Sequence, residues 1–545
     1  MNLIVSMADN SLKIGSCSEK TLKVLLCISQ LLSGGYFTTG LGLEAAIGAG
    51  TSTHAEYRDT TDDISLLNTY YYRLADRASV MDPSQRYSHN FKPVSIREST
   101  RLFENRARLS DFKAIIDRYY DRREAENISD GPFLLKPLKE IHGQGVYSEK
   151  EDAPLLSNYG NELDGRYYGS LIAGGNAYLM DWVVAGYNLR FSNDADEGVD
   201  TVDFWRYKLK TGFDHISIAA AKENVVIGPG HFGNLISSSN VQPENGIIIK
   251  TEVPYDWGFL GAFRWYVWHT WYDDDERSNR DPKVMGARVS LMPGNLWELS
   301  ITRFAMFGGS NNDNFDSLEA YWKMFTAEDE NQPGSRYNSQ QQMSGDLTIY
   351  LPLLKYYTPF YGGKLYGEYA FTDLRAFWQP EDKEIFEPLS ESWLIGLMMT
   401  TGRTDVHLEY VKVHRKAYGG SGGIGDQGVS DNGYLIGHVA GIKTSGLQGE
   451  IYSECLPWLH LHAGLGYFDH VKKDSNNMDN VYDHQQEWVY SAGLHFFIRN
   501  GLSIDTKVEY RNANDTDTNP DPVVYSFNGE GYHHAVFSLQ GSYYF

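Results

Sequence analysis

The last nine residues of the chain, Phe537 to Phe545, alternate between a mainly apolar face and a mainly polar face. Phe537, Leu539 and Tyr543 fall on one face of the strand that this pattern predicts. Gln540 falls on the other face, and the aromatic Phe545 comes last. Chain ends usually fray, so a soluble protein rarely keeps so apolar a strand there. A transmembrane barrel must pair its last strand with its first to satisfy every backbone group in the membrane, so this pattern predicts a closed β-barrel.

The composition supports a barrel of the outer-membrane type. Aromatic residues make up 14% of the chain, with 38 Tyr and 12 Trp, yet the mean hydropathy is only −0.43. No apolar run approaches the ~20 residues that a membrane-spanning helix needs. Transmembrane strands produce this combination because only every second residue faces lipid. The net charge of −23 argues against nucleic acid as a partner. We therefore expect a protein of the outer membrane of a Gram-negative bacterium.

Residues 1–55 are predicted to be a signal peptide and leader. Lys20 and Lys23 precede an apolar run of secretory length that begins at Val24. Two of the three cysteines lie in this leader, so only Cys455 would remain after processing. No intrachain disulfide is then expected.

Residues 56–136 are predicted to be a small helical segment. Ile64, Leu67 and Tyr71 recur at spacings of three and four residues, Pro93 opens a second helical pattern, and Ser110 resembles the N-cap of a third. Because this segment lies between the leader and the barrel, we expect it in the periplasm. A location inside the barrel lumen is the alternative.

Residues 137–545 are predicted to form the barrel. Their apolar side chains follow a period of two in eighteen segments, the first near 138–148 and the last near 534–545. An even number of strands is what a closed bacterial barrel requires. One further candidate, Tyr434 to Ile442, breaks this parity and is assigned to a loop.

The predicted connections alternate between short and long. Gly175-Asn176 and Pro293-Gly294 are assigned as short turns, whereas 308–341 is a long polar loop. Barrels of this class have short periplasmic turns and longer extracellular loops. The long loops are therefore predicted to face the cell exterior.

Side-chain alternation also predicts which face of each strand meets lipid. In the strand from 501 to 511, Ile504 would face lipid and Asp505 the lumen. Arg303 departs from this rule because it shares a face with Leu299 and Ile301. Its position requires a β-bulge or a place at the barrel rim.

Three segments resemble the capsule assembly Wzi family. Glu223 to Asn240, which contains Gly-Pro-Gly, is similar to the family's W-G-P-G segment and the small-residue run after it, although Ile227 replaces the tryptophan. Gly286 to Gly309 resembles its P-x-x-x-x-E strand with an arginine and a final glycine pair, and Leu365 to Ala370 resembles its L-Y-G-E strand. The order and spacing hold from about residue 60 to residue 545.

This resemblance implies an eighteen-stranded barrel preceded by helices. It also implies a non-catalytic role, in which the protein binds surface polysaccharide and assists capsule attachment or assembly. The implied partners are that polysaccharide, outer-membrane lipid and lipopolysaccharide, and the barrel assembly machinery, which would read the final aromatic residue. A porin or a polysaccharide export channel is the rival, and an open or filled lumen would separate the two.

The motif Gly228-Pro229-Gly230 has two interpretations. It could hold a loop that folds into the lumen and narrows it. It could also be a tight turn at a strand end, where glycine supplies positive φ and proline supplies rigidity.

Aromatic side chains next to polar ones in long loops are candidate polysaccharide contacts, because an aromatic ring packs on the C–H face of a sugar. The candidates are Trp322, Trp378, Tyr337, Arg336 and Arg375. The alternative is loop packing or a place in the aromatic girdle at the membrane interface.

No cofactor is expected except possible calcium in the outer loops. Asp515, Asp517, Asn519 and Asp521 have the alternating spacing of a calcium loop, but Pro520 replaces its turn glycine. Solvated acidic loops are the alternative.

The sequence gives little sign of an enzyme. His460 and His462 would share the luminal face of one strand as a possible metal pair, but no third ligand stands at a diagnostic spacing. No nucleophile motif or phosphate loop is present, and we predict a binding protein.

Overall fold

The computed structural model describes the residues 62–81, 90–98, 133–149, 159, 166–180, 182–193, 201–213, 215–272, 280–309, 317–326, 339–372, 390–414, 417–418, 429–431, 434–473, 482–498, 502–514 and 532–544. All of them belong to one compact unit, Tyr57–Phe545. The predicted leader, 1–55, lies outside the described residues.

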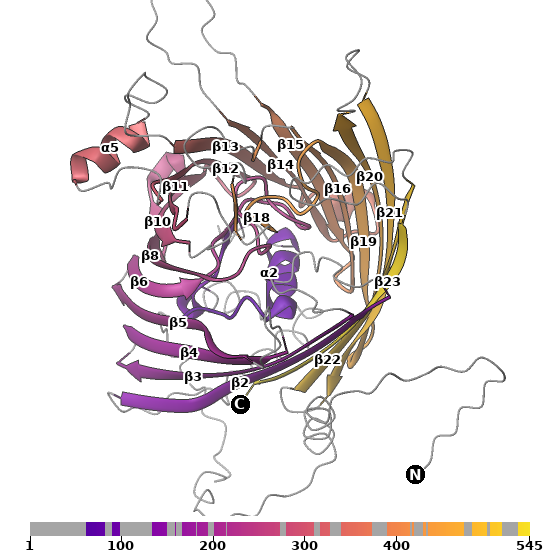
Figure 1. Cartoon of the computed structure of the whole chain (residues 1–545), viewed down its shortest axis with the longest axis horizontal. Helices are drawn as coiled ribbons and strands as arrows, with labels where there is room; N and C mark the ends of the chain where they lie inside the picture. The colour runs from indigo at the N-terminus through magenta and orange to yellow at the C-terminus, as the bar shows by residue number, and fades with distance from the viewer. Residues whose placement is uncertain are drawn as a thin grey trace, which may run out of the picture. The chain divides into compact units, whose positions relative to one another are not determined.

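Eighteen antiparallel strands pair in chain order and form a closed barrel wall (Figure 1). The wall strands are β2 (Phe133–Ser148), β3 (Tyr167–Leu179), β4 (Val183–Ser192), β5 (Thr201–Phe213), β6 (Ile216–Glu223), β8 (Glu244–Thr251), β10 (Ala262–Trp271), β11 (Lys283–Met292), β12 (Trp297–Phe307), β13 (Ser339–Tyr350), β14 (Gly362–Thr372), β15 (Ser392–Thr400), β16 (Thr404–Val413), β19 (Thr444–Leu456), β20 (Leu459–Lys473), β21 (Tyr482–Ile498), β22 (Leu502–Asn514) and β23 (Tyr532–Tyr544). Each of the eighteen predicted segments overlaps one of these strands, so the predicted fold class is confirmed.

The smaller described elements are α2 (Thr69–Met81), α5 (Leu318–Thr326), α6 (Leu354–Tyr357), the 3-10 helix η2 (Gly258–Leu260) and the two-residue strands β1 (Phe91–Lys92), β7 (Val226–Ile227), β9 (Tyr255–Asp256), β17 (Ser430–Asp431) and β18 (Tyr434–Leu435). Among the residues that the structure describes, no helix has the length and apolarity needed to cross a bilayer.

The final strand closes the barrel. β23 pairs antiparallel with β2 from Glu140 opposite Tyr544 to Ser148 opposite Val536, and on its other side it pairs with β22. The backbone groups of this apolar strand are thus hydrogen-bonded on both sides, as the membrane requires.

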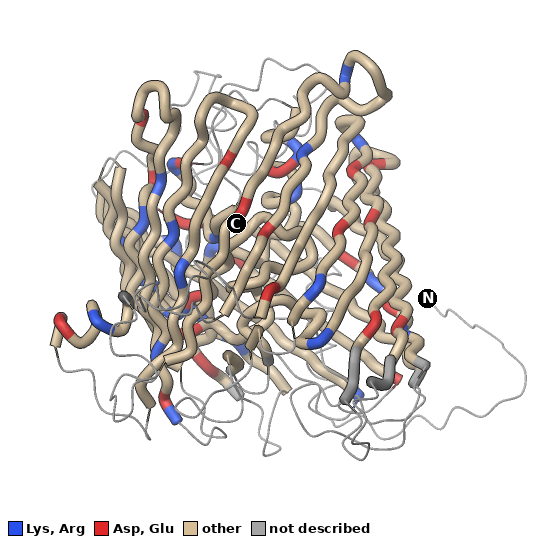
Figure 2. The backbone as a smooth tube through the Cα atoms, turned by 90° about the horizontal axis from the view of Figure 1, so that it is seen from above, with Lys and Arg blue, Asp and Glu red and all other residues tan. Residues whose placement is uncertain are grey.

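The wall is apolar outside and polar inside. On β12, Ile301 is 63% exposed on the outer face, whereas Glu298 and Thr302 are fully buried on the inner face. Figure 2 shows charged positions of both signs along the strands. Buried residues such as Lys210 and Asp405 show that the inner face carries charges of both signs.

The connections alternate in length, and we name the two ends of the barrel by them. At the long-loop end, strands are joined by segments such as 308–338 and 414–443, and at the short-turn end by segments such as 293–296 and 401–403. Gly294 has a φ of +73°, which suits the predicted turn at Pro293-Gly294.

The predicted turn at Gly175-Asn176 is wrong, because both residues lie inside β3. The pairing of β2 with β3 shifts register between Lys136 and Glu140. A Cβ on Gly175 would lie 2.4 Å from the carbonyl oxygen of Pro137 in this irregular stretch. The glycine therefore marks a close approach of two strands instead of a chain reversal.

Arg303 does not lie at a bulge. The pairing of β12 with β11 and with β13 is continuous, and Arg303 faces outward in the half of β12 nearer the long-loop end. Neither alternative is correct, because Arg303 lies four residues before the end of β12 and contacts Gln341 of β13 and Phe325 of α5 there.

The predicted helical segment is present in part, and its expected place is wrong. α2 contains Tyr71 and follows Ile64 and Leu67, and a second helical stretch begins at Ile96, three residues after Pro93, whereas Ser110 lies outside the described residues. Figure 1 shows α2 within the ring of strands. The described part of this segment lies in the lumen and not in the periplasm, because its charges pair with the inner wall.

Candidate functional site in the filled lumen

Three segments that are far apart in the sequence fill the barrel interior, and we call them together the luminal plug. They are the described residues of 62–98, 224–243 and 429–442. β1 of the first pairs with β7 of the second, and Ser238 of the second donates its N–H to Ile436 of the third at 2.9 Å. The parity-breaking segment at Tyr434 belongs to this plug and not to the wall, as predicted.

Arg77 of α2 is a fully buried charge of the plug. Its side chain is 1% exposed and forms a two-pronged ion pair with Asp405 of β16, at 2.9 Å from Nε and 2.7 Å from Nη2. It also pairs with Glu454 of β19 and donates to the carbonyl oxygen of Gly402. Burial by itself lowers the pKa of the Arg77 guanidinium, but the two carboxylates outweigh burial and raise it. Arg77 is therefore a fixed positive charge.

Two further charges of α2 meet opposite charges on other strands. Arg73 donates to Glu450 of β19 at 2.7 Å and lies 3.9 Å from the ring centre of Tyr452. Asp76 accepts from Lys364 of β14 at 2.7 Å. The charged side chains of α2 thus pair with opposite charges on β14, β16 and β19.

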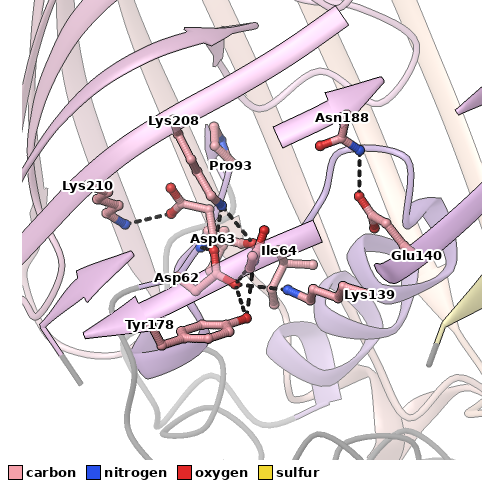
Figure 3. Close-up of polar contacts among 12 residues, drawn as sticks. Asp62, Asp63, Ile64, Pro93, Lys139, Glu140, Tyr178, Asn188, Lys208 and Lys210 are labelled. Carbon is pink, nitrogen blue, oxygen red and sulfur yellow. Dashed lines mark hydrogen bonds and ion pairs between the residues drawn. The ribbon is translucent and has the colours of Figure 1, made fainter. Parts of the chain in front are cut away.

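The adjacent carboxylates of Asp62 and Asp63 form the second charged contact with the wall (Figure 3). Asp62 lies 2.8 Å from the Nζ of Lys139 and 2.5 Å from that of Lys208. It also accepts from the Tyr178 hydroxyl at 2.9 Å. Burial alone would raise the pKa of the Asp62 carboxyl, but the two lysines outweigh burial and hold it well below its usual range.

Asp63 has the same arrangement with a second pair of lysines. Its Oδ1 lies 2.7 Å from Lys210 of β5 and 2.8 Å from Lys250 of β8. Burial raises the pKa of this carboxyl, and the lysines lower it further than burial raises it. A cavity of about 10 Å³ beside these groups has room for roughly one water molecule.

The motif Gly228-Pro229-Gly230 lies in the lumen. Gly228 has a φ of +125° and donates its N–H to the carbonyl oxygen of Asn90 at 3.0 Å. A Cβ at Gly228 would lie 2.5 Å from Oδ1 of Asn234, the same atom that accepts from the Gly230 N–H at 2.7 Å. Both interpretations of the motif therefore describe it, since it is a tight turn within a loop that folds inward.

Wall carboxylates hold this infolded loop by its backbone. Glu409 of β16 accepts from the His231 N–H at 2.8 Å and from the Tyr366 hydroxyl at 3.0 Å. Glu368 of β14 accepts from the Leu235 N–H at 2.9 Å. These bonds satisfy backbone donors that would otherwise be buried without partners.

The model of the capsule assembly protein Wzi family matches residues 146–519, which is more than half of the chain. The chain belongs to this family. Among solved structures it is similar to Wzi of Escherichia coli, an outer-membrane protein described as a carbohydrate-binding β-barrel involved in group 1 capsule assembly. That likeness covers 88% of this chain and 98% of that one at 15% identity, with a TM-score of 0.63, and it shows the fold.

Two structures from Pseudomonas aeruginosa are also similar. OprD matches over 74% of this chain and 94% of its own at 11% identity, with a TM-score of 0.44. OccK10 (OpdN) matches over 74% and 98% at 9% identity, also with a TM-score of 0.44. None of the curated proteins is significantly similar in sequence. The wall and the Wzi family membership together place the chain in the outer membrane of a Gram-negative bacterium.

Two of the segments that carry the Wzi resemblance meet at the boundary between plug and wall. Glu368 of the L-Y-G-E segment binds the N–H of Leu235 in the segment after Gly-Pro-Gly. Arg288 of the remaining segment forms a two-pronged ion pair with Asp346 at 2.6 and 2.9 Å. In this member of the family, the Glu368 contact links the infolded loop to the wall, and the Arg288 pair joins β11 to β13.

Of the predicted polysaccharide contacts, Trp322 is the one that lies within the described residues. Trp322 lies on α5, outside the wall, and is 64% exposed. The other candidates lie outside the described residues: Trp378, Tyr337, Arg336 and Arg375, together with the calcium candidates Asp515, Asp517, Asn519 and Asp521.

One residue of the predicted histidine pair, His460, packs against the plug. Nδ1 of His460 lies 2.6 Å from the Tyr452 hydroxyl, and its ring packs 5.7 Å from Tyr70 of the plug. In the described part of the chain, no three His, Cys, Asp or Glu side chains are grouped so that they could hold a metal ion.

Sequence reasoning missed the residues that dock the plug. Arg77, Asp62 and Asp63 are not among the residues predicted for the site, and their partners are charged residues on the inner face of the wall strands. The available signal was the inward face of those strands. Its charges of both signs in a closed barrel need partners from inside the lumen.

Proposed function

We propose that this protein binds surface polysaccharide at the cell exterior and assists the attachment or assembly of a capsule. The role is one of binding and not of catalysis. Membership of the Wzi family carries the proposal, and the filled lumen supports it over a conduit for polysaccharide.

The filled lumen matters because a conduit for a polymer needs a continuous passage. The plug instead packs an apolar cluster inside the wall, including Ile227, Leu235 and Ile436 at 0–1% exposure. Its charged residues are paired with the wall, so leaving the lumen would expose those pairs as well. A surface role needs no such passage.

Aromatic residues and arginines of the long loops are the proposed sugar contacts. Trp378 with Arg375, and Tyr337 with Arg336, combine a ring that can stack on a sugar with a donor that can bind hydroxyl or acidic groups. Loops on a rigid barrel are common places for binding residues.

The charge of the long loops limits the kind of polysaccharide. Loop segments such as Asp273-Asp274-Asp275-Glu276 are acidic, and like charges repel an acidic polymer at short range. The polysaccharide is therefore neutral or basic, or divalent cations bridge it to carboxylates such as Asp515 and Asp521.

A clean deletion strain tests the proposal. We expect polysaccharide to appear in the medium while total synthesis is unchanged, and complementation with Trp378→Ala and Tyr337→Ala together to restore retention only in part. The matched complementation with Phe at both positions should retain more. If the polymer is acidic, chelation of calcium should reproduce the release in the parent strain.

The channel alternative predicts a different result. Unchanged cell-bound polysaccharide in the deletion strain, together with steady ion conductance of the purified wild-type barrel in planar bilayers, would overturn the proposal.

A further inference from the structure

The outer surface of the wall has a gap in its aromatic girdle at the long-loop end. On one side of the gap, Trp271 of β10 faces outward and is 39% exposed, and on the other Trp393 of β15 is 41% exposed. Between them, on the outer face of the described strands β11, β12 and β13, the half nearer the long loops has Phe307 as its sole aromatic residue. Outer-membrane barrels normally carry aromatic residues around this level.

The same sector carries outward-facing polar groups. Arg303 of β12 and Gln341 of β13 are hydrogen-bonded to each other on the outer face. A charged side chain on the lipid face costs about 2–4 kcal/mol at the membrane midplane and less toward the interface. This part of the wall therefore needs a cover.

α5 supplies that cover from outside the ring of strands (Figure 1). Its Ala320 and Met324 pack with the outward-facing Ala305 and Phe307. Gln341 donates to the carbonyl oxygen of Met324 at 2.9 Å, which satisfies one of the free carbonyl groups at the helix end.

The two flanks of α5 differ in chemistry. On one flank Lys323 pairs with Glu319 at 3.2 Å, and both are exposed in part. On the other flank the Arg303 guanidinium lies 5.3 Å from the ring centre of Phe325. We call the flank that carries Phe325 the apolar flank. Arg303 precedes Phe307 by four residues and therefore lies farther from the long loops. Because the apolar flank lies beside Arg303, it points toward the membrane centre. Trp322 lies between the flanks and is 64% exposed.

We propose that α5 lies in the outer leaflet of the membrane, at the boundary between headgroups and acyl chains, and completes the aromatic girdle. Lipid covers the exposed face of α5, and Trp322 contacts lipid instead of polysaccharide. A charged flank toward the headgroups and an apolar flank toward the acyl chains is the pattern of an interfacial helix. The outer face of the wall beside Arg303 is apolar, with the paired Ile301 and Val289 63% and 44% exposed. This inference does not depend on the proposed function.

Lipid quenching of a fluorophore tests the position of α5. Trp322→Cys and Glu319→Cys are each made with Cys455→Ser, labelled with the fluorophore NBD and reconstituted in phosphatidylcholine vesicles with brominated acyl chains. We expect bromine to quench the label at 322 at least twofold more than the label at 319, and aqueous iodide to give the opposite order. Heat-modifiable gel mobility shows that both variants are folded.

Equal iodide quenching at both sites, without bromine quenching at 322, would overturn the proposal. So would a spectral change at 322 on adding surface polysaccharide purified from the parent strain. As a label-free measurement, Trp322→Ala should lower the temperature at which the vesicle-bound barrel loses its folded gel mobility, and Trp322→Phe should not. Loss of capsule retention without any change in quenching would bear on the proposed function and would leave the position of α5 unaffected.

Discussion

Two helices pack on opposite faces of the same wall, and their contacts differ in kind. Inside, α2 presents Arg73, Asp76 and Arg77 to wall residues of opposite charge. Outside, α5 presents Ala320 and Met324 to apolar side chains. The wall's alternation therefore decides how an added segment can bind, through ion pairs on the luminal face and through apolar packing on the lipid face.

The two kinds of contact also differ in how precisely they fix the position of a helix. Apolar packing tolerates shifts of a helix, whereas a two-pronged contact such as that of Arg77 with Asp405 fixes distance and angle. These ion pairs thus hold the plug in one register, in addition to the apolar cluster that it packs inside the wall.

The largest effect is expected for Arg77→Met. The fully buried Asp405 would lose its main counter-charge, and breaking a buried pair in this way costs about 3–5 kcal/mol. Hydrogen exchange of residues 69–81 should accelerate, and the barrel should show intermittent conductance in planar bilayers. Arg73→Met is the control with a smaller effect, because the Arg73 side chain is 22% exposed.

Adding Asp405→Asn to Arg77→Met should recover part of the loss by removing the unpaired charge. Unchanged exchange in Arg77→Met would mean that apolar contacts alone hold the plug and that the contrast between the two faces is wrong.

A smaller effect is expected from pH. The folded-state pKa of Asp62 and of Asp63 lies below the usual value of about 3.9. Their contribution to plug docking is therefore complete above about pH 4 and is lost as the pH falls below it. Hydrogen exchange of residues 62–81, corrected for intrinsic rates, should show unchanged protection from pH 7 to 5 and a decline toward pH 3.

Asp62→Asn is the matched variant. It should weaken docking at pH 7 by about 2 kcal/mol, because Lys139 and Lys208 lose a charged partner, and it should flatten the pH dependence. Protection that declines already between pH 7 and 5 would contradict the lowered pKa values.

Gly228→Ala should have a still smaller effect. Its φ of +125° and the Asn234 side chain at 2.5 Å both oppose a Cβ, with an expected cost of about 1–2 kcal/mol to the infolded loop. Gly145→Ala is the control, since a Cβ there meets nothing within 4 Å. Thermal loss of folded gel mobility would measure both variants, and equal temperatures for them would exclude a conformational role for Gly228.

The sequence predicted the wall well because lipid and lumen impose opposite demands on alternate residues. Each of the eighteen strands shows this two-residue period within its own sequence, so it can be predicted without knowing its contacts with distant residues. The Gly175-Asn176 error shows the limit of this reasoning. A glycine can serve a turn or a close approach of backbones, and its neighbours in sequence do not distinguish the two.

Contacts between distant residues could not be predicted in the same way. Arg77 and Asp405 are 328 positions apart, so the expected periplasmic location of the helical segment ignored the pairing that holds it inside. α5 was likewise treated as loop, because nine residues carry only a short helical pattern. The role of Glu368 in binding the infolded loop also depended on the three-dimensional fold.

The smallest effect is expected for Glu319→Gln on the outside. The Glu319 side chain is 76% exposed and its pair with Lys323 lies between neighbouring turns of one helix, so the pair contributes only about 0.3–0.5 kcal/mol. Folded gel mobility should be lost within about one degree of the wild-type temperature, and 1 M salt should not change the difference, since screening removes a term that is already small. Met324→Ala is the matched variant on the wall-facing side of α5, where the side chain is 1% exposed. It should lower that temperature clearly, because it removes apolar contact with Ala305 and Phe307. If Glu319→Gln destabilised the barrel more than Met324→Ala, α5 would be held by charge as α2 is, and the two faces of the wall would not differ in the way they bind a helix.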